Sequence, residues 1–232
     1  MAGTDIRVDG PDGSFGAYLA RPSSGSGPGV VVIQEIFGVN KVVRDVADGF
    51  AARGYFAIAP DLFWRLEPGV QLTDKTDAEW QRAFGLMQKF DIDAGVKDIQ
   101  ACISYLRGLD GCSGKVGAVG YCLGGLLSYL AATRTDVDAS VGYYGVNIDQ
   151  KLDEAKNIRK PLLLHIAEKD QYVKPEAQKK IAEALKGNSH VTLHFYPQMD
   201  HAFAREGGAH YDKACAELAN GRTSTFFKQH LS

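Results

Sequence analysis

The amino-acid sequence predicts an α/β protein whose mostly parallel sheet is flanked by helices. Short runs of β-branched and aromatic residues alternate along the chain with longer stretches of helical periodicity, which is the pattern of strand–helix–strand units. The run Val30–Ile33 is apolar throughout, as expected of a central strand that is buried on both faces of a sheet. Since its 232 residues contain no repeat and no linker, the chain is expected to form one domain, 1–232.

Up to residue 110, strands and helices are expected in a simple succession. In chain order these are two strands within Ile6–Ala20, the strand Val30–Ile33, the helix Lys41–Arg53, the strand Tyr55–Ala59, and the helices Asp77–Phe90 and Asp93–Leu109. The turn signal Pro11-Asp12-Gly13 separates the first two strands. Asn40 and Asp77 are expected to cap helices, and Gly54 to end one. The irregular stretch 62–76 is long enough to form a wall of a functional site.

Beyond residue 110 the same alternation continues. The expected elements are the strand Lys115–Val119, the helix Leu123–Thr133, the strand Ala139–Gly145, a short mixed stretch Lys151–Asn157, the strand Pro161–Ile166, the helix Pro175–Leu185, the strand Val191–Tyr196 and the helix His210–Lys228. Pro175 suits a first helical turn because its ring fixes φ and no N–H is needed there. In such a sheet the loops that follow the strands meet at one edge, where sites form.

Charge and composition exclude several classes of function. Lys plus Arg number 26 and Asp plus Glu 28, and the net charge of −2 leaves no basic footprint for a nucleic-acid or membrane partner. No stretch approaches roughly 18 consecutive apolar residues, and the N-terminus has no apolar signal core. The four cysteines form no C-x-x-C pair, so we expect no metal, no cofactor and a reduced, cytoplasmic protein. A monomer or small homo-oligomer is expected.

One stretch joins a strand, a tight turn and a helix around a single nucleophile. Apolar residues lead into Gly-x-Cys-x-Gly, which carries Cys122 between Gly120 and Gly124, and a helix-competent run follows. A side chain at either glycine would collide where strand and helix fold back on each other. The turn is expected to strain the backbone at Cys122, and the helix N-terminus to favour its thiolate. A buried, inert thiol in a glycine-rich turn is the simpler alternative.

Three further loops, each of which follows an expected strand, carry the groups that Cys122 would need for catalysis. The order along the chain is nucleophile, then acid (Asp170), then histidine (His201), which is the order of the α/β-hydrolase triad. His201 would accept the thiol proton and later pass it to the leaving group, while Asp170 would orient the imidazole. The backbone N–H groups of Leu123 and Ile36 would form an oxyanion hole.

Each of these side chains also has a simpler interpretation. Asp170 could only cap a turn, and Asp200, beside the candidate histidine, is expected to be solvated or locally hydrogen-bonded. His165 and His194 lie within strand patterns and are expected to be packing or surface residues. Glu35 follows an apolar strand in the loop expected to face the nucleophile, although an ion pair with an arginine would also explain it.

Five motifs give the chain its resemblance to the dienelactone hydrolase family. They are Gln34–Asn40, Ala59–Leu62, Gly117–Gly125, Gly142–Gly145 and His201–Arg205. The resemblance covers essentially the whole chain and implies an α/β-hydrolase fold. It also implies hydrolysis of a carboxylic ester or lactone, of the dienelactone or carboxymethylenebutenolide kind, through an acyl-enzyme. It assigns the triad to Cys122, His201 and Asp170, and it gives Glu35 an interaction with the resting thiol that substrate binding would change.

The resemblance also indicates a substrate pocket, in which this sequence departs from the family pattern. The expected pocket residues are Arg205, Tyr144, Phe37, Trp80, Phe84 and Met87. Arg205 is one of the two arginines that hold the substrate carboxylate in the best-known members. Trp80 stands at the position of the other, and Arg82, two residues further along a helix, is turned by about 200° from it. Phe84, Met87 and Ala202 replace an aromatic hydroxyl, a tryptophan and a serine. The pocket is therefore predicted to be more apolar and less cationic.

Two other classes of function share some of these features. Class I glutamine amidotransferases have the same elbow but pair their histidine with a glutamate, and His201-Ala202-Phe203 lacks that glutamate. A redox-sensing or ligand-binding protein could use an activated Cys122 on a hydrolase-like scaffold. The sequence favours an ester or lactone hydrolase over both.

Overall fold

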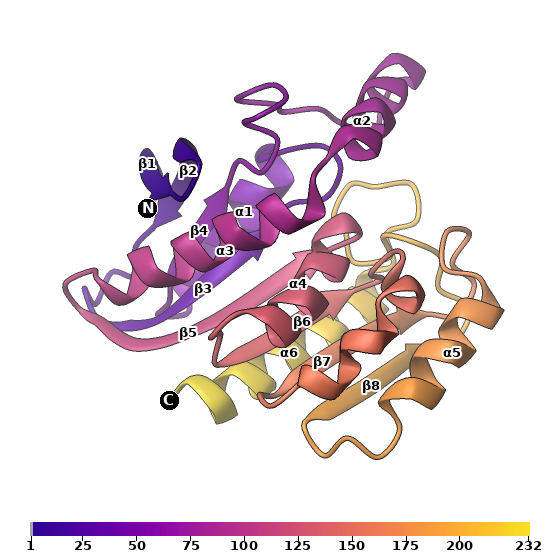
Figure 1. Ribbon diagram of the computed structural model, residues 1–232. Helices are drawn as coiled ribbons and strands as arrows, with labels where there is room; N and C mark the ends of the chain where they lie inside the picture. Colours follow the sequence, from indigo (N-terminus) through magenta and orange to yellow (C-terminus); the bar gives the residue numbers. More distant parts are fainter. Residues whose placement is uncertain (1) are drawn as a thin grey trace. The chain divides into compact units, whose positions relative to one another are not determined.

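The computed structural model describes residues 2–232, which form two compact units (Figure 1). The first unit ends at Ala118 and the second runs from Val119 to Ser232. The boundary falls inside a single strand, β5 (Cys112–Tyr121), which begins in the first unit and ends in the second. Whether the whole chain behaves as one domain stays a prediction.

The first unit is built on four strands and the beginning of β5. These four are β1 (Thr4–Gly10), β2 (Gly13–Ala20), β3 (Gly27–Ile33) and β4 (Phe56–Pro60). In space they follow the order β1-β2-β4-β3-β5. The β1/β2 and β2/β4 pairs are antiparallel, whereas β3 and β4 are parallel, with Gly29 opposite Phe56. Residues 29–33 of β3 and all of β4 are buried, as their apolar sequences predict.

Three helices belong to this unit: α1 (Lys41–Ala52), α2 (Asp77–Lys89) and α3 (Ile92–Arg107). Asn40 caps α1 as predicted, because its side chain accepts a hydrogen bond from the Val43 N–H. The prediction for α2 was wrong by one residue. Thr76 is the cap, with an extended backbone and a hydroxyl that accepts from the Glu79 N–H, and Asp77 already lies in the first turn. There its negative charge still suits the positive end of the helix.

The second unit continues from the end of β5 through three parallel strands. These are β6 (Ala139–Tyr143), β7 (Leu162–Ala167) and β8 (Val191–Tyr196), in spatial order β5-β6-β7-β8. Ser140 lies opposite Leu162, which in turn lies opposite Val191. The strand β6 stops two residues earlier than expected, because Tyr144 has a φ of 37° and turns the chain out of the sheet.

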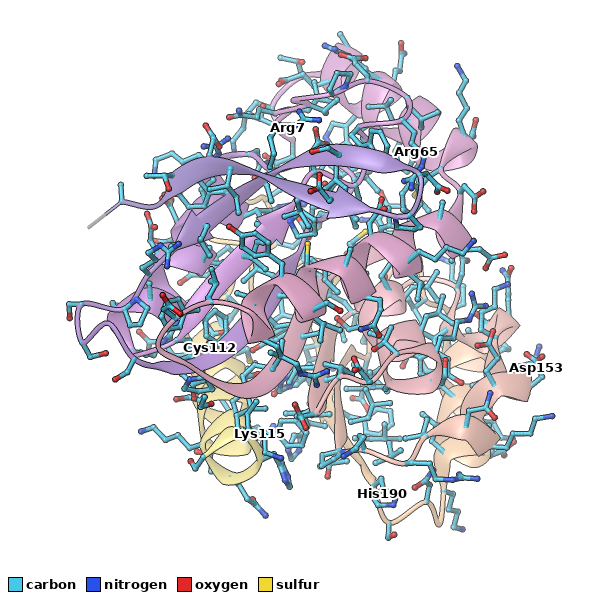
Figure 2. All side chains as sticks on the ribbon, turned by 60° about the vertical axis from the view of Figure 1, so that its left-hand side comes forward. Arg7, Arg65, Cys112, Lys115, Asp153 and His190 are labelled. Carbon is cyan, nitrogen blue, oxygen red and sulfur yellow. The ribbon has the colours of Figure 1, made fainter. Side chains whose placement is uncertain are left out.

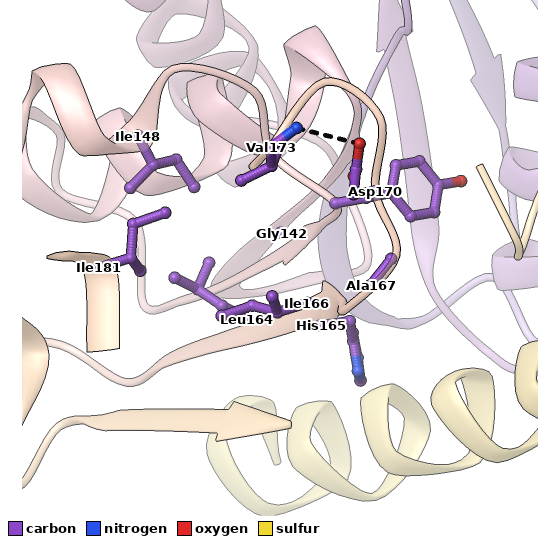
Figure 3. Close-up of a pocket in the computed structure, with 11 residues that line it drawn as sticks. Gly142, Ile148, Leu164, His165, Ile166, Ala167, Asp170, Val173 and Ile181 are labelled. Atoms are coloured by element: carbon purple, nitrogen blue, oxygen red, sulfur yellow. Dashed lines mark hydrogen bonds between the residues drawn. The ribbon is translucent and has the colours of Figure 1, made fainter. Parts of the chain in front are cut away.

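Helices lie on both faces of these strands. On one side are α4 (Leu123–Arg134), α5 (Pro175–Leu185) and two short 3₁₀ helices, η1 (Ile148–Gln150) and η2 (Leu152–Asn157); on the other is α6 (Lys213–Leu231) (Figure 1). Successive side chains of a strand point to opposite faces of the sheet, so the position of a residue along the strand decides which helix its side chain contacts. Leu164 and Ile166 point toward Ile181 of α5, whereas His165 between them points toward α6 (Figure 3).

The fold class predicted from the sequence is confirmed. Strands and helices alternate, the pairs β3/β4, β6/β7 and β7/β8 are parallel, and the pairs β1/β2 and β2/β4 are antiparallel. Among the helices of residues 2–232, none has the length and apolarity that crossing a membrane requires.

Candidate active site

Cys122 lies at a strained turn between β5 and α4. Its backbone has φ 56° and ψ −114°, a conformation that a non-glycine residue rarely adopts. The turn is this tight because a Cβ on Gly120 would lie 2.0 Å from the Gly124 carbonyl oxygen. Hydrogen bonds hold the strained residue in place: its N–H donates to Tyr143 O (3.1 Å), and its carbonyl accepts from Gly125 N (3.0 Å). The expected backbone strain at Cys122 is therefore present.

The helix that follows Cys122 starts at once. Leu123 is the first residue of α4, so its N–H belongs to the end turn that has no acceptor within the helix. The positive end of the helix dipole lies at the same place and favours a negative charge nearby. The Cys122 side chain is 8% exposed and forms no disulfide. The thiol thus lies just below the surface, beside a helix N-terminus.

Asp170 and His201 lie on two loops that follow parallel strands, and they form a direct contact. His201 Nδ1 is 2.8 Å from Asp170 Oδ2, and both side chains are almost fully buried. The second carboxylate oxygen of Asp170 accepts hydrogen bonds from the backbone N–H groups of Tyr172 (2.8 Å) and Val173 (3.1 Å). The contacts that the two alternative interpretations require are therefore both present, on different oxygens of one side chain.

The charge state of His201 is set by its two neighbours. Burial disfavours the imidazolium, but the Cys122 sulfur and the Asp170 carboxylate outweigh burial and raise the pKa of His201 from 6.5 to about 10. The ring nitrogen opposite Asp170, Nε2, is buried and bonds to no nitrogen or oxygen of residues 2–232. Cys122, His201 and Asp170 are thus brought together with the histidine between a sulfur and a carboxylate.

Two tyrosines pack edge-on against the His201 ring. Tyr144 lies 5.0 Å from it between ring centroids and Tyr172 lies 4.9 Å from it. Tyr144 was predicted as a pocket residue and is buried. Tyr172 was not among the residues predicted from the sequence. Its side chain is 43% exposed, so a ligand can reach it. Burial and the charges of Cys122 and Asp170 raise the pKa of Tyr172. Its position two residues after the acid was the one available signal.

The loops of the acid and the histidine are tied together by Asp200. Its Oδ1 accepts from the His201 N–H (2.6 Å) and from the Gln171 N–H (3.0 Å). A backbone hydrogen bond from Lys169 N to Met199 O (2.8 Å) joins the same two loops. The expectation of a locally hydrogen-bonded Asp200 is confirmed, and its hydrogen bonds connect the loop of Asp170 to the loop of His201.

The other histidines lie elsewhere in the second unit. His165 is buried between Tyr196 Oη (2.7 Å from Nδ1) and Thr223 Oγ1 (2.9 Å from Nε2), which confirms it as a packing residue. His190 lies on an exposed loop at the outer edge of the unit (Figure 2). His210 approaches Asp200 at 3.7 Å. Only His201, among the histidines described, contacts a buried carboxylate at hydrogen-bond distance.

Arg205, the predicted carboxylate anchor, lies at the end of the histidine loop. The chain turns sharply at Ala202, whose φ is 64°, and the Arg205 N–H donates to Ala202 O (2.9 Å). The Arg205 side chain is 8% exposed, an unusual degree of burial for an arginine. Burial and nearby groups raise the pKa of Tyr172, and the positive charge of Arg205 partly opposes this rise. The guanidinium and this tyrosine therefore lie in the same neighbourhood.

The remaining predicted residues belong to the first unit. Glu35, Ile36 and Phe37 follow β3 and are all buried. Phe37 meets Trp80 edge-on at 5.0 Å, and Trp80 stacks on Phe84 at 5.5 Å. Met87, one turn further along α2, is half-buried. An aromatic cluster thus occupies the helix where the family pattern places a cationic residue. Arg82 forms an ion pair with Glu67.

The long loop 62–76 is held firmly in place. Arg65 pairs with the fully buried Asp98 (2.6 Å) and with Asp12 (2.7 Å), and Figure 2 labels it beside the N-terminal hairpin. Trp64 Nε1 donates to Asp98 as well (2.9 Å). At the start of the loop, Gln34 Oε1 accepts from Leu62 N (3.0 Å), which joins two of the motifs quoted above. In the described part of the chain, no group of three or more His, Cys, Asp and Glu side chains is arranged to hold a metal ion.

Comparisons with known proteins agree with this architecture. The family model described as "Dienelactone hydrolase family" matches residues 15–231. A protein of Azospirillum brasilense named "Putative carboxymethylenebutenolidase" is 55% identical over 231 residues, covering 98% of this chain and 99% of the relative. The "Carboxymethylenebutenolidase" of Pseudomonas putida is 38% identical, covering 95% and 94%.

Among solved structures, a protein of Klebsiella pneumoniae described as a "Putative Dienelactone Hydrolase" superimposes with a TM-score of 0.87 at 26% identity, covering 98% of both chains. The match of the family model spans nearly all of the chain, and the two relatives match it almost from end to end. The chain belongs to the dienelactone hydrolase family.

Proposed function

We propose that this protein hydrolyses a carboxylic ester or lactone with Cys122 as the nucleophile, His201 as the general base and acid, and Asp170 as the residue that orients His201. The observation that carries this proposal is the 2.8 Å contact between Asp170 Oδ2 and His201 Nδ1, next to a cysteine held at a strained turn. The names of the relatives, which are carboxymethylenebutenolidases, favour the same reaction class.

The first half of the reaction forms an acyl-enzyme. With Nδ1–H donated to Asp170, the Nε2 of His201 accepts the thiol proton, and the raised pKa of His201 stabilises the resulting imidazolium. The sulfur attacks the substrate carbonyl carbon, and the negative charge that develops on oxygen is held by the Leu123 N–H. When the carbon–oxygen bond breaks, His201 Nε2–H gives its proton to the departing oxygen.

The second half returns the enzyme to its starting state. A water molecule gives a proton to His201 Nε2 as its oxygen attacks the thioester carbonyl. The tetrahedral intermediate collapses, the carbon–sulfur bond breaks, and His201 Nε2–H returns its proton to the departing sulfur as the carboxylic acid forms. In a lactone the alcohol or enolate oxygen remains attached to the product, so one ring-opened acid is released.

Substrate recognition is also part of the proposal. Arg205 would pair with a carboxylate of the substrate, and Tyr144 would line the pocket beside His201. Glu35, Ile36, Phe37, Trp80, Phe84 and Met87 keep the roles that the family resemblance implies: interaction with the thiol, the second oxyanion-hole N–H, and an apolar pocket wall. The apolar residues that the family resemblance assigns to this wall predict a preference for substrates with an apolar or aromatic acid over the more polar dienelactone itself.

The test is hydrolysis by wild type, Cys122→Ala and Cys122→Ser of a panel that contains aryl esters, neutral lactones and dienelactones. We expect Cys122→Ala to lose turnover with all of them while its circular dichroism spectrum is unchanged, and mass spectrometry of wild type quenched during turnover to find the acyl group on Cys122. Full activity in Cys122→Ala contradicts the proposed triad. Absent turnover combined with ready oxidation of Cys122 would favour a redox-sensing protein instead.

A further inference from the structure

We propose that Gln178 is a positioning residue, which holds the loop 167–173 in place and thereby keeps Asp170 against His201. The inference deepens the proposed function and rests on it, because Asp170 matters for turnover only as the acid of the triad. Gln178 lies in the first turns of α5, carries no charge, and belongs to none of the motifs that relate the chain to its family.

The amide of Gln178 reaches both ends of the acid loop. Its Nε2 is 2.7 Å from Val173 O at one end, and 3.1 Å from Ala167 O and 3.4 Å from Glu168 O at the other. An amide group has two N–H donors, so these carbonyls share them. Gln178 is 7% exposed, and the bonds to Val173 and Ala167 are buried from water. One side chain therefore bridges the two ends of the loop from behind.

Val173 connects this bridge to the triad. Its carbonyl accepts from Gln178 (2.7 Å), and its N–H donates to Asp170 Oδ1 (3.1 Å), the bond that is dashed in Figure 3. The other oxygen of the same carboxylate faces His201 Nδ1 at 2.8 Å. A continuous set of hydrogen bonds thus runs from Gln178 through Val173 and Asp170 to the imidazole.

The aliphatic side chains behind the loop cannot take over the hydrogen bonds of Gln178. A cavity of about 10 Å³ lies behind Asp170 and Val173, and Leu164, Ile166 and Ile181 face into it (Figure 3). These aliphatic side chains cannot donate a hydrogen bond. A buried carbonyl that loses its donor carries the full desolvation cost, so the loop is expected to shift until Val173 O finds water, whereas Ala167 O still accepts from Asp170 N (3.4 Å). Such a shift carries Asp170 away from His201.

The alternative is that Gln178 only stabilises the start of α5, whose N-cap, Lys174, makes no capping hydrogen bond through its side chain. The two roles predict different effects on the pKa of His201 when the hydrogen bonds of Gln178 are lost. Asp170 is one of the groups that raise the pKa of His201, so a displaced Asp170 lowers this pKa, whereas a weakened helix end leaves it unchanged.

The experiment compares Gln178→Met with two controls in the full-length protein. Methionine keeps the length of the side chain but has no donor. Gln229→Met makes the same exchange at an exposed position of α6, and Leu185→Ala removes packing at the buried end of α5. Each variant is measured by ester kinetics, by thermal unfolding, and by an NMR pH titration of the His201 imidazole.

For Gln178→Met we expect kcat to fall between about 10-fold and 100-fold with KM nearly unchanged, since displacement of a catalytic group by about 1 Å has effects of this size. The His201 titration should move to lower pH. Gln229→Met should match the wild type in all three measurements, and Leu185→Ala should unfold at a lower temperature with an unchanged His201 titration. A Gln178→Met protein that loses thermal stability but keeps the wild-type titration and kcat overturns the proposal.

Gln178→Glu gives an independent test. If Gln178→Met does not fold, the kinetics of Gln178→Glu decide the proposal. A protonated glutamic acid keeps one donor toward the carbonyls, whereas the carboxylate has none and repels them. Its kcat relative to wild type should therefore fall as pH rises from 5 to 8; a constant ratio overturns the proposal. Because the titration of His201 needs no substrate, a failure here is distinguishable from a failure of the Cys122 test.

Discussion

Two buried histidines of the same unit show how neighbouring groups decide the role of a side chain. His165 and His201 are both almost fully buried, and tyrosine rings pack against both. His165 lies between the hydroxyls of Tyr196 and Thr223, whereas His201 lies between a carboxylate and a sulfur. The pKa of His165 is lowered well below 6.5 by burial and by the positive charges of His194 and Arg222, while that of His201 is raised to about 10.

The difference shows that burial alone does not determine what a histidine does. Burial disfavours the imidazolium at both positions, and hydroxyl partners do nothing to offset it at His165. A sulfur on one side of the ring and a carboxylate on the other reverse the outcome at His201. His165 therefore serves to join strands and helix through neutral hydrogen bonds, with Tyr143 Oη completing the network at 2.6 Å from Thr223 Oγ1. His201 can carry a proton, which is the property that catalysis needs.

The strongest test of this comparison exchanges each histidine for glutamine. His201→Gln should lower kcat for ester hydrolysis by roughly 10³-fold to 10⁴-fold, since glutamine cannot relay a proton. His165→Gln, the matched control, should leave kcat within about two-fold where the protein is folded. Steady-state kinetics on an aryl ester measures both, and comparable losses of kcat would show that the two histidines do not differ in role.

Asp170→Asn should have the next largest effect. The amide keeps the size of the side chain but removes the charge that raises the pKa of His201 and can hold the wrong tautomer of the ring. We expect kcat to fall about 10²-fold to 10³-fold and the NMR titration of His201 to move to lower pH. Asp200→Asn, which keeps an oxygen for the His201 and Gln171 N–H groups, serves as the control and should cost less than about ten-fold. An unchanged His201 titration in Asp170→Asn would contradict the assignment of the acid.

His165→Phe should affect stability and leave the chemistry intact. The substitution leaves the hydroxyls of Tyr196 and Thr223 without their partner in a buried site, so the free energy of unfolding should fall by about 2–4 kcal/mol. Urea unfolding followed by fluorescence measures this change, and kcat below the transition should match the wild type. A kcat loss as large as that of Asp170→Asn would mean that the network around His165 also supports the catalytic loops.

The two histidines should also limit stability at opposite ends of the pH range. The folded pKa of His201 is raised, so its contribution is complete below pH 6.5 and is lost as pH rises through about 10. The folded pKa of His165 is lowered, so its contribution is complete above 6.5 and declines as pH falls below it. Each slope is at most about 1.4 kcal/mol per pH unit. Thermal unfolding from pH 5 to 10 should show a flatter alkaline side in Cys122→Ala and a flatter acid side in His165→Phe.

The smallest expected effect distinguishes two arginines, one near each histidine. Arg205→Ala should raise KM by about ten-fold for esters that carry a carboxylate and much less for neutral esters, because the guanidinium is the proposed carboxylate anchor. Arg222, whose guanidinium lies over the Tyr196 ring at 5.3 Å and lowers the pKa of His165, is the control. Arg222→Ala should leave KM unchanged for both kinds of ester. Equal KM changes for anionic and neutral esters in Arg205→Ala would remove it as the anchor.

Local sequence determined most of the fold and the strained turn that carries Cys122. A cap, a turn or a strained elbow depends on residues that are neighbours in the chain, so Asn40, Pro175 and the Gly120–Gly124 turn could be recognised from their spacing. Even the error at Asp77 was local, since two adjacent residues with capping ability compete and backbone geometry selects Thr76. Strand and helix patterns also depend on residues that are close together in the chain, so their alternation predicted the parallel sheet.

The tertiary structure alone decided which polar side chains meet. The sequence could not tell whether Asp170 caps a turn or orients a histidine, and the answer depends on a contact between residues 31 positions apart. Tyr172, Asp200 and Gln178 acquire their neighbours from loops and a helix that the parallel strands bring to one edge. Hydrogen bonds and charge effects act over a few ångströms in space and are insensitive to separation along the chain. The glycine-flanked turn at Cys122 could therefore be recognised in the sequence, and Asp170 and His201 were expected beside it, whereas the contacts that raise the proton affinity of His201 became visible only in the fold.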